Sequence, residues 1–188
     1  EEISIAIDAA SSEFYHEGRY VLSGMGQSLA REEWLAFWET LVADYPIVSL
    51  EDPMDERDHL GWQQITQRLP NTQLVGDDVF VTQERWLAEG IKTGMANAIL
   101  IKPNQVGTLT ATLQTCRLAK QSGYTLVMSH RSGETEDDTI ADLAVAWGAH
   151  WIKCGAPCRS ERVAKLNRLL WIETELGQEA RYAGTSVK

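Results

Sequence analysis

The chain has 188 residues, of which 44% are hydrophobic and 23% are charged, and Asp and Glu outnumber Lys and Arg by 27 to 17. Seven Trp and this apolar content exclude an intrinsically disordered chain, because disorder requires low hydrophobicity and few aromatics. The net charge of −10 argues against nucleic acid or an anionic membrane surface as a partner. No apolar run approaches the roughly 20 residues of a membrane span.

Cysteine usage and the start of the chain bear on its context. Cys116, Cys154 and Cys158 form an odd set without an accompanying His or Cys cluster, which disfavours a disulfide framework and a zinc site. We therefore expect reduced thiols. The chain opens on Glu1-Glu2 and enters a strand pattern at once, with no signal-peptide pattern. We expect it to be a piece of a longer protein.

Short runs rich in Ile, Val and Leu alternate along the chain with segments of helical periodicity. In chain order, the runs predict strands at residues 3–8, 47–51, 73–77, 98–102, 125–130 and 151–154. The segments between them predict helices at residues 31–44, 57–69, 82–93, 107–122, 136–148 and 160–176. This alternation indicates parallel strands joined by crossover helices.

Two α/β architectures fit this alternation, an open doubly wound sheet and a (β/α)₈ TIM-type barrel. A nucleotide-binding open sheet usually has a glycine-rich loop after its first strand, whereas residues 8–12 read DAASS. Six units are two fewer than a closed barrel needs. We therefore predict a single domain over residues 1–188, the last six β/α units of a TIM-type barrel.

Each predicted strand ends in a charged or polar residue, which packing alone does not explain. These residues are Asp8, Glu51, Asp77, Lys102, the run His130-Arg131-Ser132, and Lys153. Any one of them could be a solvated strand end or half of a local salt bridge. In α/β barrels, however, the carboxyl ends of the strands are where catalytic groups converge. Their shared position predicts an active site.

The carboxylates of Asp8, Glu51 and Asp77 come from three separate strands and predict a site made of oxygen ligands. Mg²⁺ prefers such ligands and keeps positions open for water and substrate oxygens. Asp52 and Asp78 remain alternatives, because a shift of one residue exchanges the side chain that points inward.

The cationic residues predict the other half of the chemistry. A lysine such as Lys102 can act as a base when neighbouring positive charge lowers its pKa from about 10.4. Arg131 suits bidentate binding of a phosphate, and Ser132 adds a hydroxyl donor. Metal, lysine base and phosphate site together indicate proton abstraction next to a carboxylate, with the metal stabilising the resulting enolate.

Several segments, in order along the chain, resemble the motifs of enolases. They are DAASSEFY at 8–15, SLEDP at 49–53, LVGDD at 74–78, LIKPNQVGT at 100–108, SHRSGETED at 129–137 and IKCGAPCRSER at 152–162. The likeness extends from residue 4 to about residue 184. Cys154 departs from the family, which more often has Thr at that position.

The resemblance implies the reversible dehydration of 2-phospho-D-glycerate to phosphoenolpyruvate, in glycolysis and gluconeogenesis. It implies that Asp8, Glu51 and Asp77 bind Mg²⁺ and that Lys102 removes the C2 proton. The residues it implies for substrate binding are Glu51, Asp77, Lys102, His130, Arg131, Ser132 and Lys153, with Lys153 at the substrate carboxylate. It also implies a cytoplasmic homo-oligomer, a dimer or octamer, with an additional cell-surface or secreted pool allowed.

Enolases carry an N-terminal domain and two barrel strands ahead of the region that this chain resembles. In the family, that part holds the acid that protonates the departing hydroxyl, so we expect the isolated chain to be inactive. Two alternatives remain: a non-catalytic structural or surface-binding role, and another acid-sugar dehydratase of the same superfamily. The second is disfavoured by SHRSGETED, because those enzymes lack this segment and usually place a Lys pair on an earlier strand.

Overall fold

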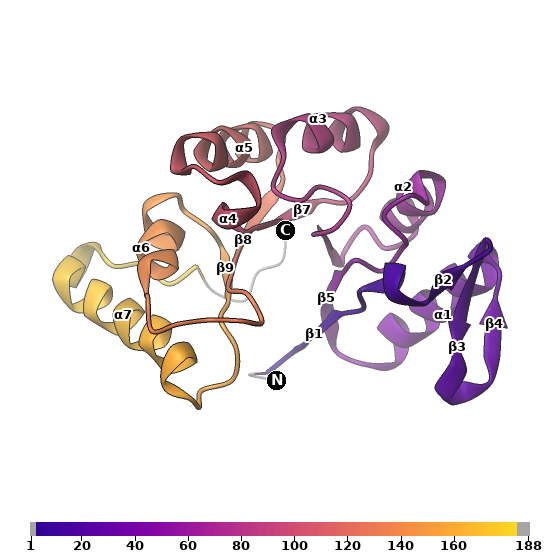
Figure 1. The fold of residues 1–188 in the computed structure, drawn as a ribbon, viewed down its shortest axis with the longest axis horizontal. Helices are drawn as coiled ribbons and strands as arrows, with labels where there is room; N and C mark the ends of the chain where they lie inside the picture. The colour runs from indigo at the N-terminus through magenta and orange to yellow at the C-terminus, as the bar shows by residue number, and fades with distance from the viewer. Residues whose placement is uncertain (1–2, 184–188) are drawn as a thin grey trace.

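The computed structural model describes residues 3–183, whose main feature is a parallel sheet of six strands. The strands are β1 (Ile5–Asp8), β5 (Ile47–Glu51), β6 (Gln73–Gly76), β7 (Ala98–Ile101), β8 (Thr125–Ser129) and β9 (Trp151–Lys153). They pair in this order, each with the next along the chain. Figure 1 shows them following an open arc with the helices on its outer side. The predicted α/β barrel architecture is confirmed, as an incomplete barrel.

Helices connect the strands as the periodicity predicts. They are α1 (Arg31–Asp44), α2 (His59–Arg68), α3 (Glu84–Thr93), α4 (Pro103–Val106), α5 (Leu109–Gln121), α6 (Thr139–Ala146) and α7 (Ser160–Leu176), with a short 3-10 turn η3 (Gly177–Glu179) after α7. None of the helices in the described part of the chain has both the length and the apolar character needed to cross a membrane.

The helix expected at 107–122 is preceded by the separate short helix α4. Pro103 stands at the first turn of α4, where its missing N–H costs nothing. Gly107 ends α4 at φ +91, a left-handed conformation that suits glycine, and Thr108 then caps α5 by accepting the N–H of Ala111. The chain therefore turns just after Lys102 and starts a new helix.

A small antiparallel sheet between β1 and α1 was not predicted. It consists of β2 (Tyr15–His16), β3 (Arg19–Leu22) and β4 (Gln27–Leu29), with the 3-10 turns η1 (Ser11–Phe14) and η2 (Ser23–Met25) beside them. Tyr20 of β3 is fully buried and stacks on Trp34 of α1, with ring centroids 5.0 Å apart. This small sheet thus packs on α1, the first helix of the barrel.

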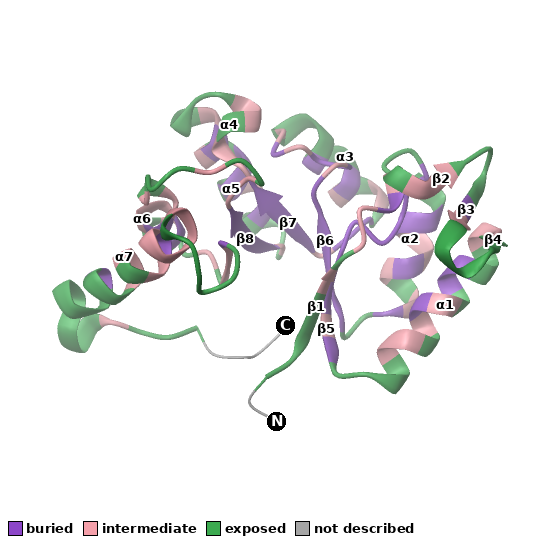
Figure 2. Cartoon of the chain, turned by 60° about the horizontal axis from the view of Figure 1, so that its bottom comes forward, coloured by how far each residue is buried: buried purple, intermediate pink, exposed green. Residues whose placement is uncertain are grey.

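The central strands are buried on both faces, which is why they read as continuous apolar runs. In β7, Ile99 and Ile101 belong to the main core, whereas Ala98 and Leu100 belong to a second cluster that also contains Val75 and Val127. Figure 2 shows this burial of the central strands against the mostly exposed β1.

Candidate active site

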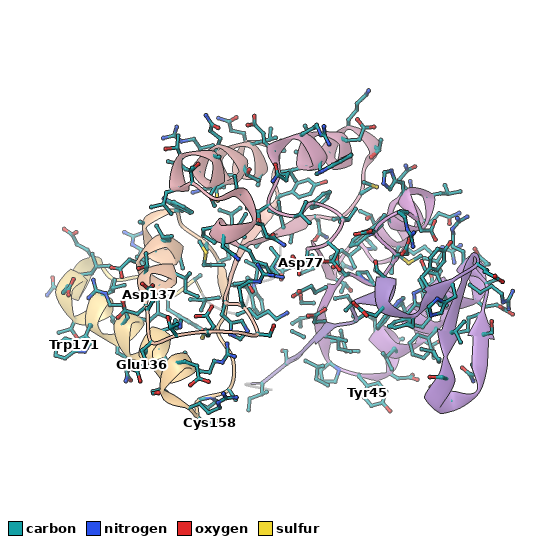
Figure 3. The ribbon with its side chains drawn as sticks, in the orientation of Figure 1. Tyr45, Asp77, Glu136, Asp137, Cys158 and Trp171 are labelled. Carbon is teal, nitrogen blue, oxygen red and sulfur yellow. The ribbon has the colours of Figure 1, made fainter. Side chains whose placement is uncertain are left out.

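The six parallel strands bring their carboxyl ends to one edge of the sheet. Asp8, Glu51 and Lys153 are the last residues of β1, β5 and β9, while Asp77 and Lys102 directly follow β6 and β7. A pocket of about 300 Å³ lies at this edge, and its lining residues are Asp8, Lys102, Ser129, His130, Arg131, Ser132 and Lys153. Most of the predicted site residues are therefore neighbours in space. In Figure 3, Asp77 lies on the inner side of the arc of strands, whereas Cys158 and Trp171 lie at the periphery.

The ammonium of Lys153 joins the two ends of the sheet. Its Nζ donates to Asp8 Oδ2 at 2.7 Å and to the two carboxylate oxygens of Glu51 at 2.9 and 3.0 Å. Asp8 lies on the first strand and Lys153 on the last, so this contact spans the open side of the barrel. Burial lowers the pKa of Lys153, but its contacts with Asp8 and Glu51 outweigh burial and raise this pKa overall.

Glu51 is a buried carboxylate in a strongly acidic neighbourhood. Burial raises its pKa to about 7, the ammonium of Lys153 opposes that shift, and the charges of Asp8 and Asp77 add to it. A carboxylate in this position is stabilised by any additional cation that reaches it. The local electrostatics therefore favour the binding of positive charge at Glu51.

Lys102 and Asp77 form the second cationic contact of the site. Lys102 Nζ donates to Asp77 Oδ2, and both side chains are mostly buried. The other oxygen, Asp77 Oδ1, is buried and has no hydrogen-bond partner within residues 3–183. A buried carboxylate oxygen without a donor is costly, and a metal ion is one group that would satisfy it. The fully buried Thr82 supports Lys102 by accepting its backbone N–H at 2.9 Å.

Asp52 and Asp78, the two alternatives to the predicted ligands, have different surroundings. Within residues 3–183, one group of carboxylates has ligand oxygens within 4.8 Å of one another, and it consists of Asp52, Asp77 and Asp78. Both oxygens of Asp52 are engaged, however, because they accept the backbone N–H groups of Asp77 and Asp78 at 2.9 and 2.8 Å. Burial raises the pKa of Asp52 well above its usual range, while these two N–H groups oppose the shift.

Asp52 therefore holds the backbone of Asp77 in place. Its φ of 42° lies in the left-handed region, which Asp tolerates better than most residues. Carboxylates from three strand ends suit a hard divalent cation such as Mg²⁺, and one of them has a buried oxygen without a partner among residues 3–183. The assignment of Asp8, Glu51 and Asp77 as its ligands stays a prediction.

The segment after β8 forms the opposite wall of the pocket, where His130, Arg131 and Ser132 lie. The backbone N–H of His130 donates to the carbonyl of Lys153 at 2.9 Å, which ties this wall to β9. Burial lowers the pKa of His130, and the nearby charge of Arg162 lowers it further. Both effects favour the neutral form of the His130 ring.

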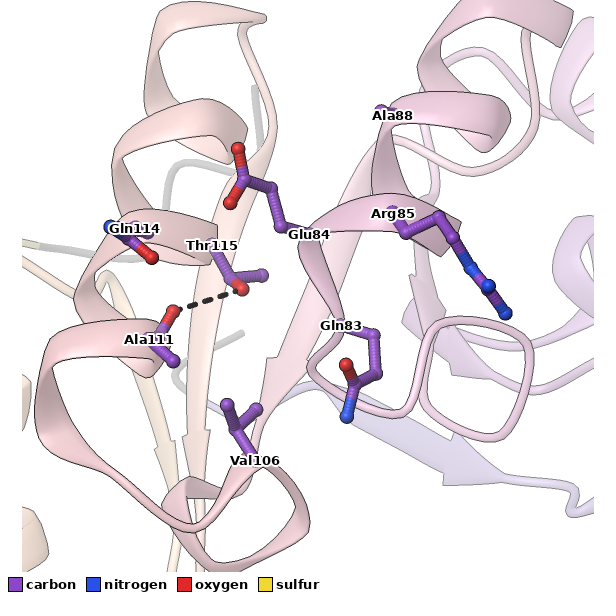
Figure 4. Close-up of a pocket in the computed structure, with 8 residues that line it drawn as sticks. All are labelled: Gln83, Glu84, Arg85, Ala88, Val106, Ala111, Gln114 and Thr115. Carbon is purple, nitrogen blue, oxygen red and sulfur yellow. Dashed lines mark hydrogen bonds between the residues drawn. The ribbon is translucent and has the colours of Figure 1, made fainter.

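A larger pocket of about 430 Å³ lies elsewhere, between α3 and the α4–α5 segment (Figure 4). Its lining residues are Gln83, Glu84, Arg85, Ala88, Val106, Ala111, Gln114 and Thr115. None of the predicted catalytic or binding residues lines it. Size alone does not make an active site, and the smaller pocket at the strand ends has the convergent charges that chemistry requires.

Sequence reasoning did not predict the positioning contacts of four residues at the site. They are Asp52, Glu134, Arg162 and Lys165, and the first three lie inside motifs already recognised. Asp52 had been weighed as an alternative ligand. Lys165 had no local signal at all, because a lysine on a helix is ordinarily solvated.

The curled parallel sheet with its outer helices defines an α/β barrel of the TIM type. The family described as "Enolase, C-terminal TIM barrel domain" matches residues 1–188. Proteins named enolase from Acidothermus cellulolyticus and Rubrobacter xylanophilus are each 56% identical to the chain over 98% of its length, and one from Nitratiruptor sp. is 59% identical over 94%. The chain therefore belongs to the enolase family. It spans 42–43% of the length of these relatives.

Proposed function

We propose that the full-length protein is an enolase, a lyase that interconverts 2-phospho-D-glycerate and phosphoenolpyruvate by removing and restoring water. One observation carries the proposal: two lysine ammonium groups lie against carboxylates at the strand ends, Lys102 on Asp77 and Lys153 on Asp8 and Glu51. The names of the relatives agree with it. Because the chain spans less than half of those relatives, the activity is proposed for the whole protein.

The site has the residues to hold Mg²⁺. Asp8, Glu51 and Asp77 are the proposed ligands, supported by the raised pKa of Glu51 and by Asp77 Oδ1, which has no hydrogen-bond partner in the described part of the chain. When bound, the ion supplies Lewis-acid stabilisation of the negative charge that develops on the substrate carboxylate.

Lys102 is the proposed base that takes the proton from C2 of the substrate. A neutral amine that accepts this proton becomes an ammonium, and the adjacent carboxylate of Asp77 stabilises that charge. The position of Lys102 after β7 places its Nζ beside the pocket. Its limited exposure, 13% of the side chain, strengthens electrostatic interactions by keeping water away.

The remaining pocket residues suit a substrate with two anionic groups. Arg131 and Ser132 are proposed to bind the phosphate, with His130 beside them, because a guanidinium and hydroxyl match phosphate oxygens. Lys153 is proposed to contact the substrate carboxylate. These cations overcome the net charge of −10, which would otherwise repel an anionic substrate. We also propose that the full-length enzyme is a cytoplasmic homo-oligomer.

The experiment compares two variants of the full-length protein with a control. In Lys102→Ala, exchange of the C2 proton with solvent should fall by about 10²- to 10⁴-fold, the usual contribution of a general base, while the affinity for Mg²⁺ is retained. In Asp77→Ala, the affinity for Mg²⁺ itself should fall. Lys92→Ala, an exposed lysine in the last turn of α3, should change neither quantity. Normal C2 exchange in Lys102→Ala would falsify the assignment of the base.

A further inference from the structure

The start of α7 contacts the segment that forms one wall of the pocket. Arg162 Nη1 lies 2.5 Å from His130 Nδ1 and donates to the carbonyl of Arg131 at 2.8 Å. Arg162 Nη2 donates to the carbonyl of Ser132, also at 2.8 Å. One guanidinium thus contacts three consecutive residues, all three of which line the pocket.

This contact determines which nitrogen of His130 carries the proton. A guanidinium only donates hydrogen bonds, so Nδ1 of His130 must accept. The neutral ring then has its proton on Nε2, the nitrogen that Arg162 does not engage. Because His130 lines the pocket, Nε2–H is the ring donor that remains for a ligand there.

A second cation of α7, Lys165, contacts the same pocket-wall segment. Lys165 is fully buried, and its Nζ donates to Glu134 Oε2 at 2.7 Å and to the carbonyls of Thr135 and Glu161 at 2.6 Å each. The other oxygen of Glu134 accepts the backbone N–H of Arg131 at 2.8 Å. Three acceptors satisfy the buried ammonium, which would otherwise be very costly. The backbone of Arg131 is thus held through Glu134 and directly by Arg162.

The path of the Arg162 side chain requires a glycine at residue 155. Gly155 adopts φ +86, and a Cβ there would lie 2.7 Å from Cδ of Arg162. The segment between β9 and α7 is therefore shaped to let the guanidinium reach the pocket wall. This observation is independent of the hydrogen bonds themselves.

We propose that Arg162 is a positioning residue that fixes His130 as a neutral donor through Nε2–H and orients Arg131 and Ser132 for an anionic group of the substrate. The identity of that group as a phosphate rests on the proposed function, whereas the state of His130 does not. If Arg162 were purely structural, it would join α7 to the pocket wall without affecting the protonation of His130 or the binding of an anionic group by Arg131 and Ser132.

The first test measures the protonation of His130 directly in the full-length protein. With ¹⁵N-labelled histidine, the ring nitrogens of His130 should show an unprotonated Nδ1 and a protonated Nε2, with the assignment made from His130→Gln. In Arg162→Met, the ring should change to a mixture of tautomers or protonate at higher pH. Arg168→Met is the matched control, because Arg168 lies on the same helix and pairs instead with Asp142 and Glu175. A protonated Nδ1 in the parent protein, or an unchanged ring in Arg162→Met, overturns the proposal.

The second test separates positioning from stability. Arg162→Met should weaken binding of inorganic phosphate and raise KM by about 10- to 100-fold, the size of effect found for residues that orient the ligands of a metal ion. Arg168→Met should lower the unfolding midpoint without changing the affinity for inorganic phosphate or the KM. Arg162→Lys, which keeps the charge but not the fork of donors, should resemble Arg162→Met and replaces it if that variant does not fold. Full recovery of phosphate binding in Arg162→Lys overturns the proposal. An inactive parent with the expected His130 tautomer would count against the proposed function alone.

Discussion

Replacing Asp52 should disturb the site without removing any group proposed to touch metal or substrate. Its side chain is buried, and its two oxygens accept the N–H groups of Asp77 and Asp78 at 2.9 and 2.8 Å. Asp52→Ala leaves both N–H groups unpaired, that of Asp77 buried and that of Asp78 partly buried, at about 1–3 kcal/mol for a buried donor. It also places alanine at φ 42°, a conformation that it tolerates poorly.

Part of this loss is offset. Burial raises the pKa of Asp52, which means that its ionised carboxylate is itself costly, so we expect a net loss of about 2–4 kcal/mol in the free energy of unfolding. Asp52→Asn should lose about half as much, because its single carbonyl oxygen can still accept one N–H. Movement of the Asp77 backbone should also lower the affinity for Mg²⁺ by about 10- to 100-fold.

The assays are denaturant unfolding and calorimetric titration with Mg²⁺, both on the full-length protein. Asp78→Ala is the matched control for the unfolding measurement, since it removes a neighbouring charge while the backbone N–H of residue 78 can still donate to Asp52. Burial and the charge of Asp77 raise the pKa of Asp78, so its loss should leave stability unchanged or slightly higher. Equal unfolding midpoints and equal Mg²⁺ affinities for Asp52→Ala and the parent would refute the reasoning.

Three further predictions concern the thiols, the core and the chain by itself. In the native protein a thiol reagent should modify the exposed Cys158 but not the buried Cys116 and Cys154, because burial raises the pKa of Cys116 to about 12 and limits access to both. Mass spectrometry locates the label, and fast modification of Cys116 would contradict this prediction. Leu87→Ala, at a fully buried position, should lower the free energy of unfolding by about 2–5 kcal/mol in denaturant titrations, while Leu109→Ala, 52% exposed, should change it little. The isolated 188-residue chain should form no detectable phosphoenolpyruvate by absorbance, and normal turnover would remove the expectation that a separate part of the enzyme supplies the acid.

Local patterns predicted the regular barrel elements well. The strands β5 and β7 were predicted to within one residue of their ends, because strands buried on both faces are mostly apolar, as in the AILI of β7 and the IVSLE of β5. α1 and α7 were predicted with the observed bounds. The small sheet β2–β4 was missed because its strands, YH, RYVL and QSL, are short and contain polar residues, so they form no apolar run of the kind that marks the barrel strands.

The sequence also predicted which residues end the strands, since that follows from their position in each run. What required the tertiary structure was the pairing of those residues. Lys153 meets Asp8 across 145 residues of chain, and Arg162 reaches His130 from a helix that follows the last strand. Asp52 turned from a candidate ligand into the acceptor for two backbone N–H groups. Secondary structure depends on neighbours a few residues apart, whereas these contacts exist only after the parallel strands bring distant segments to the same edge of the sheet.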